Sequence, residues 1–163
     1  MSYRTLRWLN KSVCNEGPLY CEYNQIKPSV AIIMFGSQDY RIYPPATFRS
    51  NMQRMVEHLL QRGVIPVNTT FPSHPDYHWY DSLVFNDINL SVAAQYNLPV
   101  INLWRATQEL PDYGVSREDL FHLSEQWGVA YSFNGQERTY GVTLRNLLTL
   151  QALDELRRNV LSQ

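Results

Sequence analysis

A carboxylate and an imidazole lie three residues apart in the segment Asp119-Leu120-Phe121-His122, within a loop-rich stretch that spans residues 112–140. A turn can bring the Asp119 side chain back onto His122, where it would orient the imidazole as a general base. A histidine on the protein surface beside an unrelated acid has the same spacing. This pattern therefore fits a catalytic pair or an ordinary surface contact, and it does not decide between them.

A second group of polar residues, Gly36-Ser37-Gln38-Asp39, follows directly after a continuous apolar run. Glycine allows a close approach to the backbone, and the side-chain amide of Gln38 can donate a hydrogen bond to a developing oxyanion. In the alternative interpretation, Gly36 breaks a strand and Asp39 caps the turn that follows. The spacing alone favours this ordinary strand-to-loop turn.

Two cysteines, Cys14 and Cys21, flank a Gly17-Pro18 pair that is typical of a turn. Such a turn could bring the thiols together in a disulfide, which would indicate an oxidising compartment. Two reduced thiols in a cytosolic protein are the other interpretation. No second Cys or His pair has the spacing of zinc ligands, so we expect neither a metal nor a cofactor.

The elements that must position these residues alternate between two types. Short apolar runs rich in β-branched residues predict strands over residues 29–35, 64–69 and 99–103. Apolar residues at helical spacing predict helices over residues 47–62, 80–96, 104–110 and 144–158. Residues 1–27 are expected to be irregular, because Pro18 and Pro28 interrupt them.

Strands that alternate with helices of this length predict right-handed βαβ crossovers, a parallel sheet and an α/β fold. Sites in such sheets lie beyond the carboxyl ends of the strands. The remaining histidines have less specific interpretations. We expect His58 on the polar face of a helix, and His74 and His78 in the loop after the second strand.

The order of these patterns resembles the SGNH/GDSL hydrolase family. The resemblance runs through SVAIIMFGSQD, GVIPVNTTFP, FNDINLSVAAQYNLPVINLWRA and REDLFHLS, which together cover residues 28–124. It implies a three-layer α/β/α fold with a flavodoxin-like parallel sheet, occupying residues 28–163. It also implies hydrolysis of acyl or carbohydrate esters through a Ser–His–Asp arrangement, with a small-molecule or carbohydrate ester as the substrate.

The resemblance implies a role for several residues of this chain. His122 matches the general base of the family, and Asp119 matches the acid that orients it. Gly36 matches a position in the oxyanion glycine loop, and Gln38 stands where the family has an oxyanion Asn. Because Gln is one methylene longer than Asn, its amide needs a different rotamer to reach the same point, so we expect partial or total loss of this donor.

The nucleophile block of the family, G-D-S, does not occur in the chain, and its first βαβ unit has no match. Ser37 lies beside the expected position, but adjacent strands are about 4.8 Å apart, too far for a simple replacement. The sequence therefore predicts a truncated or catalytically impaired ester hydrolase. A non-catalytic remnant that binds carbohydrate or lipid is the alternative. Residues 30–34 should form an exposed edge strand, through which a homodimer could form.

The composition excludes several other classes. The 163 residues include 14 Lys and Arg against 15 Asp and Glu, a balance that argues against a nucleic-acid-binding protein. The longest apolar run, Val30 to Phe35, is far too short to cross a bilayer, and Met1 to Asn10 does not resemble a signal peptide. An extracellular or envelope location is suggested only by the predicted cysteine bridge.

Overall fold

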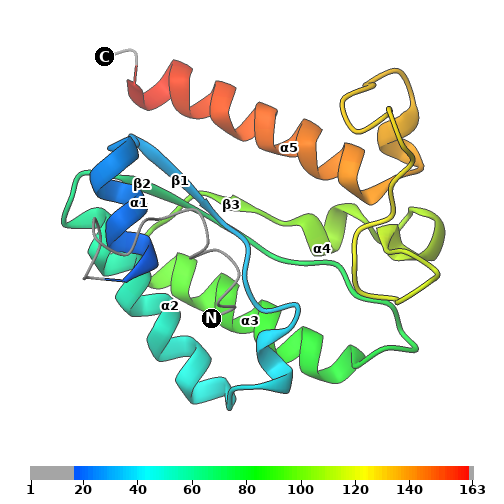
Figure 1. Ribbon diagram of the computed structural model, residues 1–163, viewed down its shortest axis with the longest axis horizontal. Helices are drawn as coiled ribbons and strands as arrows, with labels where there is room; N and C mark the ends of the chain where they lie inside the picture. The colour runs from blue at the N-terminus through cyan, green and yellow to red at the C-terminus, as the bar shows by residue number, and fades with distance from the viewer. Residues whose placement is uncertain (1–16, 162–163) are drawn as a thin grey trace.

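A parallel sheet of three strands in the order β1-β2-β3 lies at the centre of the computed structural model, which describes residues 17–161 (Figure 1). Strand β1 spans Val30–Ile33, β2 spans Ile65–Thr69 and β3 spans Val100–Ile101. All strands point the same way, so their carboxyl ends lie at one edge of the sheet. The predicted α/β class and parallel sheet are confirmed.

Strand β1 forms the edge of the sheet within the described part of the chain. It pairs in parallel with β2, with Val30 opposite Ile65. No strand among residues 17–161 pairs with its outer side. Ile32 in this strand and Met34 just after it are exposed. The predicted edge position of this strand is confirmed for the described residues.

Helices cover both faces of the sheet. Helix α2 (Pro45–Leu60) and helix α3 (Trp79–Gln95) lie on one face, and helix α5 (Gly141–Leu156) lies on the other (Figure 1). Because the strands follow one another in order, right-handed crossovers place both connecting helices on the same face. The resulting three-layer α/β/α arrangement agrees with the prediction.

Each face of the sheet has its own apolar core. The larger core lies under α2 and α3, where the apolar residues recur at helical spacing and point towards the sheet. Its buried members are Ile33, Phe48, Met52, Val56, Leu59, Val64, Phe71, Phe85, Ile88 and Val92. The smaller core lies under α5 and consists of Val67, Ile101, Leu103 and Leu156.

Helix α1 (Pro18–Ile26) corrects the prediction that residues 1–27 are irregular. Pro18 stands at the start of the helix, where its missing N–H costs nothing, so this proline begins a helix instead of breaking one. The helix packs Tyr20 against His58, with ring centroids 3.7 Å apart. His58 is consequently only 6% exposed, and its expected place on a polar helix face is wrong.

Cys21 lies on α1 and is buried. Its predicted disulfide partner, Cys14, lies outside the described residues, so the pairing stays a prediction. Short helical turns complete the chain: η2 (Asp39–Arg41), α4 (Leu103–Ala106), η3 (Pro111–Gly114), η4 (Gln136–Arg138) and η5 (Arg157–Leu161). Among the described residues, no helix is both long and apolar enough to cross a membrane.

Buried amides on α3 fix the segments that leave the sheet. Asn86 accepts a hydrogen bond from the Phe71 backbone N–H at 2.9 Å and donates one to the Phe71 carbonyl at 2.8 Å. Asn89 donates to the carbonyl of Phe35 at 3.0 Å. The side chains therefore satisfy backbone groups that no strand pairs, and they hold the carboxyl ends of β1 and β2 in place.

Candidate active site

The side chains of Asp119 and His122 are in direct contact. His122 Nδ1 lies 2.5 Å from Asp119 Oδ2, and the His122 ring is exposed, with 71% of the side chain accessible. The other carboxylate oxygen accepts the backbone N–H groups of His122 at 3.0 Å and Phe121 at 3.1 Å. When Nδ1 carries its proton towards Asp119, Nε2 keeps a lone pair that can accept a proton.

The backbone around this pair forms a closed loop. Val115 and Leu123 make an antiparallel bridge, and the Ser116 N–H donates to the His122 carbonyl at 2.8 Å. Leu120, between the two functional side chains, has φ +61°. This left-handed residue turns the chain so that Asp119 faces back towards His122.

Several hydrogen bonds keep Asp119 charged. Burial alone would raise the pKa of Asp119, but the hydrogen bond from the His122 ring and those from the two backbone N–H groups together lower it. The carboxylate is therefore ionised at neutral pH. An ionised partner holds the imidazole in one orientation and stabilises the imidazolium that forms when His122 takes up a proton.

The Gly36–Asp39 segment forms a tight turn at the end of β1. Gly36 has φ +121°, and its N–H donates to Asp39 Oδ2 at 2.9 Å. A Cβ atom at this position would lie 2.3 Å from the Phe71 ring, so only glycine fits. The N–H of Gly36 is thus directed at Asp39, which matches the turn that the spacing favoured. Its matched oxyanion position stays a prediction.

The oxygen and the nitrogen of the Gln38 side-chain amide have different surroundings. Its Oε1 lies 3.4 Å from Arg41 Nη1, whereas its buried Nε2 has no hydrogen-bond partner among residues 17–161. A buried donor without a partner is uncommon and costly, and it can be satisfied by a bound oxygen atom. No hydrogen bond joins Gln38 to His122 in the part of the chain that the structure describes. Its oxyanion role stays a prediction.

The serines do not complete the site. Ser37 is half-buried and makes no hydrogen bond to His122 among the described residues. Ser124 accepts the Gly141 N–H at 3.0 Å, where it joins the His122 loop to α5. Ser37 as a substitute nucleophile therefore stays a prediction.

The remaining histidines lie in local contacts. His74 faces the ring of Tyr113, with centroids 5.5 Å apart. His78 begins α3, and its Nδ1 is 3.2 Å from Asp81 Oδ2. Within residues 17–161, no cluster of His, Cys, Asp and Glu has the arrangement of a metal site.

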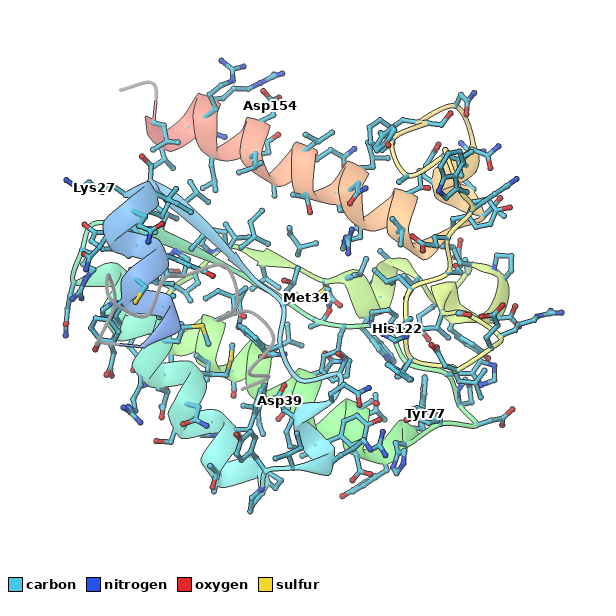
Figure 2. The ribbon with its side chains drawn as sticks, in the orientation of Figure 1. Lys27, Met34, Asp39, Tyr77, His122 and Asp154 are labelled. Carbon is cyan, nitrogen blue, oxygen red and sulfur yellow. The ribbon has the colours of Figure 1, made fainter. Side chains whose placement is uncertain are left out.

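One residue near the predicted site was not found from the sequence. Tyr77 contacts one residue beside the Gly36–Asp39 turn and one in the His122 loop, and Figure 2 shows Tyr77 and His122 at the right of the molecule with Asp39 at the lower centre. Its hydroxyl is 3.4 Å from Arg41 Nη1, and its ring stacks on Phe121. Its place in the loop after the second strand was the available signal, but its partners are distant in sequence.

Comparisons with known proteins identify the family and the fold. A model of the GDSL-like lipase/acylhydrolase family matches residues 11–126, well over half of the chain. The crystal structure of the lipase/acylhydrolase from Enterococcus faecalis is 25% identical, with a TM-score of 0.56, over 80% of this chain and 68% of that one. A GDSL-like lipase from Bacteroides thetaiotaomicron has a TM-score of 0.60 at 14% identity, over 84% and 69% of the two chains.

The chain matches only part of the length of each of its structural neighbours. The chain spans between 59% and 69% of the lengths of four similar solved structures. A comparison with curated proteins finds no match.

Proposed function

Because the chain belongs to the GDSL-like lipase/acylhydrolase family, we propose that it carries the acid–base part of an ester-hydrolase site. His122 is the general base, Asp119 orients it, and Gln38 donates to the oxyanion. The substrate is an acyl ester or a carbohydrate ester. Because no G-D-S block occurs in the sequence, we propose that the chain by itself is catalytically impaired.

The observation that supports this proposal is the 2.5 Å contact between His122 Nδ1 and Asp119 Oδ2. In ester hydrolysis, a hydroxyl gives its proton to the imidazole as its oxygen attacks the ester carbonyl. The imidazolium then gives that proton to the departing alkoxide. The exposed Nε2 side of His122 and the ionised carboxylate of Asp119 suit both transfers.

The missing part of this mechanism is the nucleophile. Without an activated serine, no acyl-enzyme intermediate forms, and the two-step route is closed. Ser37 is the substitute that the sequence offers, because it lies beside the expected position at the end of the neighbouring strand. We infer that it is not competent, since its strand lies one position away from the one that bears the family nucleophile.

An assay with short-chain nitrophenyl esters tests the proposal. We expect no turnover above the buffer rate from the chain itself. If the coding sequence upstream of Met1 encodes an in-frame G-D-S block, the extended protein should hydrolyse these esters. His122→Ala should then lower kcat by about 10²–10⁴-fold, whereas the control His74→Ala should leave it unchanged. Turnover by the present chain that disappears in His122→Ala would overturn the impaired interpretation.

Exposed aromatic residues favour a second function, the binding of carbohydrate or lipid without catalysis. Trp127 is fully exposed and Tyr131 is 75% exposed, both on the segment that follows the His122 loop. The backbone between them is held by α5, because Asn146 donates to the Ala130 carbonyl at 2.8 Å and Thr143 to the Val129 carbonyl. Aromatic rings on a fixed backbone suit stacking on sugars or insertion at a lipid surface.

A glycan array and sedimentation with phosphatidylcholine vesicles test this second function. Binding that Trp127→Ala abolishes, and that Tyr80→Ala on the exposed face of α3 leaves unchanged, would support it. A folded chain that binds neither probe would exclude it.

A homodimer through the exposed edge of β1 also stays a proposal. Antiparallel pairing of two β1 edges would cover the backbone groups that no described strand pairs. Light scattering measures the mass in solution, and Ile32→Lys should dissociate a dimer of this kind. A monomeric wild-type chain would contradict it.

A further inference from the structure

We propose that Tyr77 is a positioning residue that holds the His122 loop and the Gln38 side chain in register with each other. Its ring acts on His122 through Phe121, and its hydroxyl acts on Gln38 through Arg41. The inference rests on the proposed function, because that function makes His122 and Gln38 the groups to be aligned.

The ring side of Tyr77 reaches the histidine. Tyr77 and Phe121 are stacked, with centroids 5.7 Å apart and an angle of 23° between the rings. Phe121 in turn lies against His122, with centroids 4.1 Å apart. Because Asp119 fixes only Nδ1, the imidazole could otherwise rotate about that contact. The Phe121 ring lies against the imidazole at a tilt of 40°, and this close contact restricts the rotation sterically.

The hydroxyl side of Tyr77 reaches the amide. Arg41 Nη1 lies 3.4 Å from the Tyr77 hydroxyl and 3.4 Å from Gln38 Oε1, so one guanidinium nitrogen contacts both. Since the guanidinium only donates, it must face the oxygen of the Gln38 amide. The Gln38 Nε2 group therefore points away from Arg41. This Nε2 group is buried and has no hydrogen-bond partner among the described residues.

Tyr77 can serve both sides because its own position is fixed. Its backbone N–H donates to the His74 carbonyl at 3.0 Å, in the loop that leaves β2. The start of that loop is held by Asn86 through both backbone groups of Phe71. The neighbouring Tyr40 is also affected: burial first, and then Tyr77, raise the pKa of its hydroxyl. Tyr77 thus connects the Gln38 and His122 side chains to the sheet.

Two substitutions distinguish the role of the Tyr77 hydroxyl from that of its ring. Tyr77→Phe keeps the ring and removes the hydroxyl, so the Gln38 amide should lose its fixed orientation while His122 keeps its support. Tyr77→Leu removes the ring and the hydroxyl, so both Gln38 and His122 should lose their fixed orientation. Tyr80→Phe and Tyr80→Leu are matched controls, because Tyr80 is an exposed tyrosine on the neighbouring helix.

NMR spectroscopy of the full, isotope-labelled chain reports on both the Gln38 amide and the His122 ring, and it does not require enzymatic activity. We expect Tyr77→Phe to shift the side-chain amide resonances of Gln38 and to preserve the NOE between the Phe121 and His122 rings. Tyr77→Leu should shift the Gln38 resonances and abolish that NOE. The Tyr80 variants should change neither signal.

Some outcomes would overturn the inference. Unshifted Gln38 resonances in Tyr77→Phe would show that the Tyr77 hydroxyl does not orient Gln38. A preserved NOE between the Phe121 and His122 rings in Tyr77→Leu would show that the Tyr77 ring does not position His122. If Tyr77→Leu does not fold, Phe121→Leu replaces it, with the expectation that His122 resonances shift and Gln38 resonances do not. Turnover by the present chain that disappears in His122→Ala would contradict the proposed impairment and leave these NMR readings intact.

Discussion

The backbone N–H of Gly36 donates a hydrogen bond to the carboxylate of Asp39 at 2.9 Å, and this contact closes the turn at the end of β1. Gly36 is buried, and Asp39 is the acceptor that the structure gives its N–H. The contact determines where Gln38 lies, because Gln38 is inside the turn. A side chain three residues away therefore holds the predicted oxyanion segment.

Asp39→Ala should destabilise the chain by about 1–3 kcal/mol, since it leaves a buried donor without an acceptor. Asp39→Asn keeps an acceptor oxygen and should lose less. Urea denaturation measures both, with Asp87→Ala as a control on an exposed acid of α3. Equal losses for the alanine and asparagine variants would contradict the role of this hydrogen bond.

Gly36→Ala should be more harmful than an alanine at another left-handed glycine. At Gly36 the added Cβ would lie 2.3 Å from the Phe71 ring, whereas at Gly63, with φ +70°, nothing lies within 4 Å. Both variants have the strain of a positive φ, about 1–2 kcal/mol. Only Gly36→Ala adds the steric overlap, about 1–3 kcal/mol more. Thermal unfolding of the two variants compares them, and similar melting temperatures would be inconsistent with close packing at Gly36.

The lowered pKa of Asp119 makes its contribution to stability depend on pH in a defined direction. A carboxyl whose pKa is lower in the folded state stabilises that state above its unfolded pKa of about 3.9, and this contribution is lost as pH falls through the folded pKa. Asp119→Asn should therefore be less stable than the wild type at neutral pH. The difference in unfolding free energy should shrink below about pH 4. A difference that is independent of pH would show that folding does not lower the pKa of Asp119.

The sequence predicted the parts of the fold that depend on local patterns. The β-branched run before Gly36 was correctly predicted as a strand, and its edge position followed from the missing family unit. The Asp119–His122 contact agrees with one of the two interpretations of its spacing, because residues three apart can meet in a turn. The strand and the contact involve neighbours in the chain, whereas the edge position rests on the resemblance to the family.

The features that sequence analysis missed depend on residues that are distant in the chain. Helix α1 begins with a proline, which was interpreted as a breaker, and only its packing on α2 shows why His58 is buried. Tyr77 meets Arg41 and Phe121 only because three loops converge at the carboxyl edge of the sheet. No spacing within one segment indicates such a convergence.

Asn86 should be the α3 residue on which the Gly36–Asp39 turn most depends. It pairs with both backbone groups of Phe71, and the ring of Phe71 lies against Gly36. Asn86→Ala removes both hydrogen bonds and leaves a buried N–H and a buried carbonyl unpaired, with an expected loss of about 2–4 kcal/mol. Asn51→Ala on the exposed face of α2 should change stability by less than about 0.5 kcal/mol.

Hydrogen exchange separates this local effect from a general loss of stability. If Asn86 fixes Phe71 and Phe71 supports the turn, the Gly36 amide should exchange faster in Asn86→Ala under conditions in which the amides of β2 remain protected. Loss of protection at every amide to the same extent would mean that Asn86 stabilises the whole fold and not this turn. Because Gln38 is within the turn, its side-chain amide should shift in the NMR spectrum of the same variant, which would connect a buried helix residue to the predicted oxyanion donor.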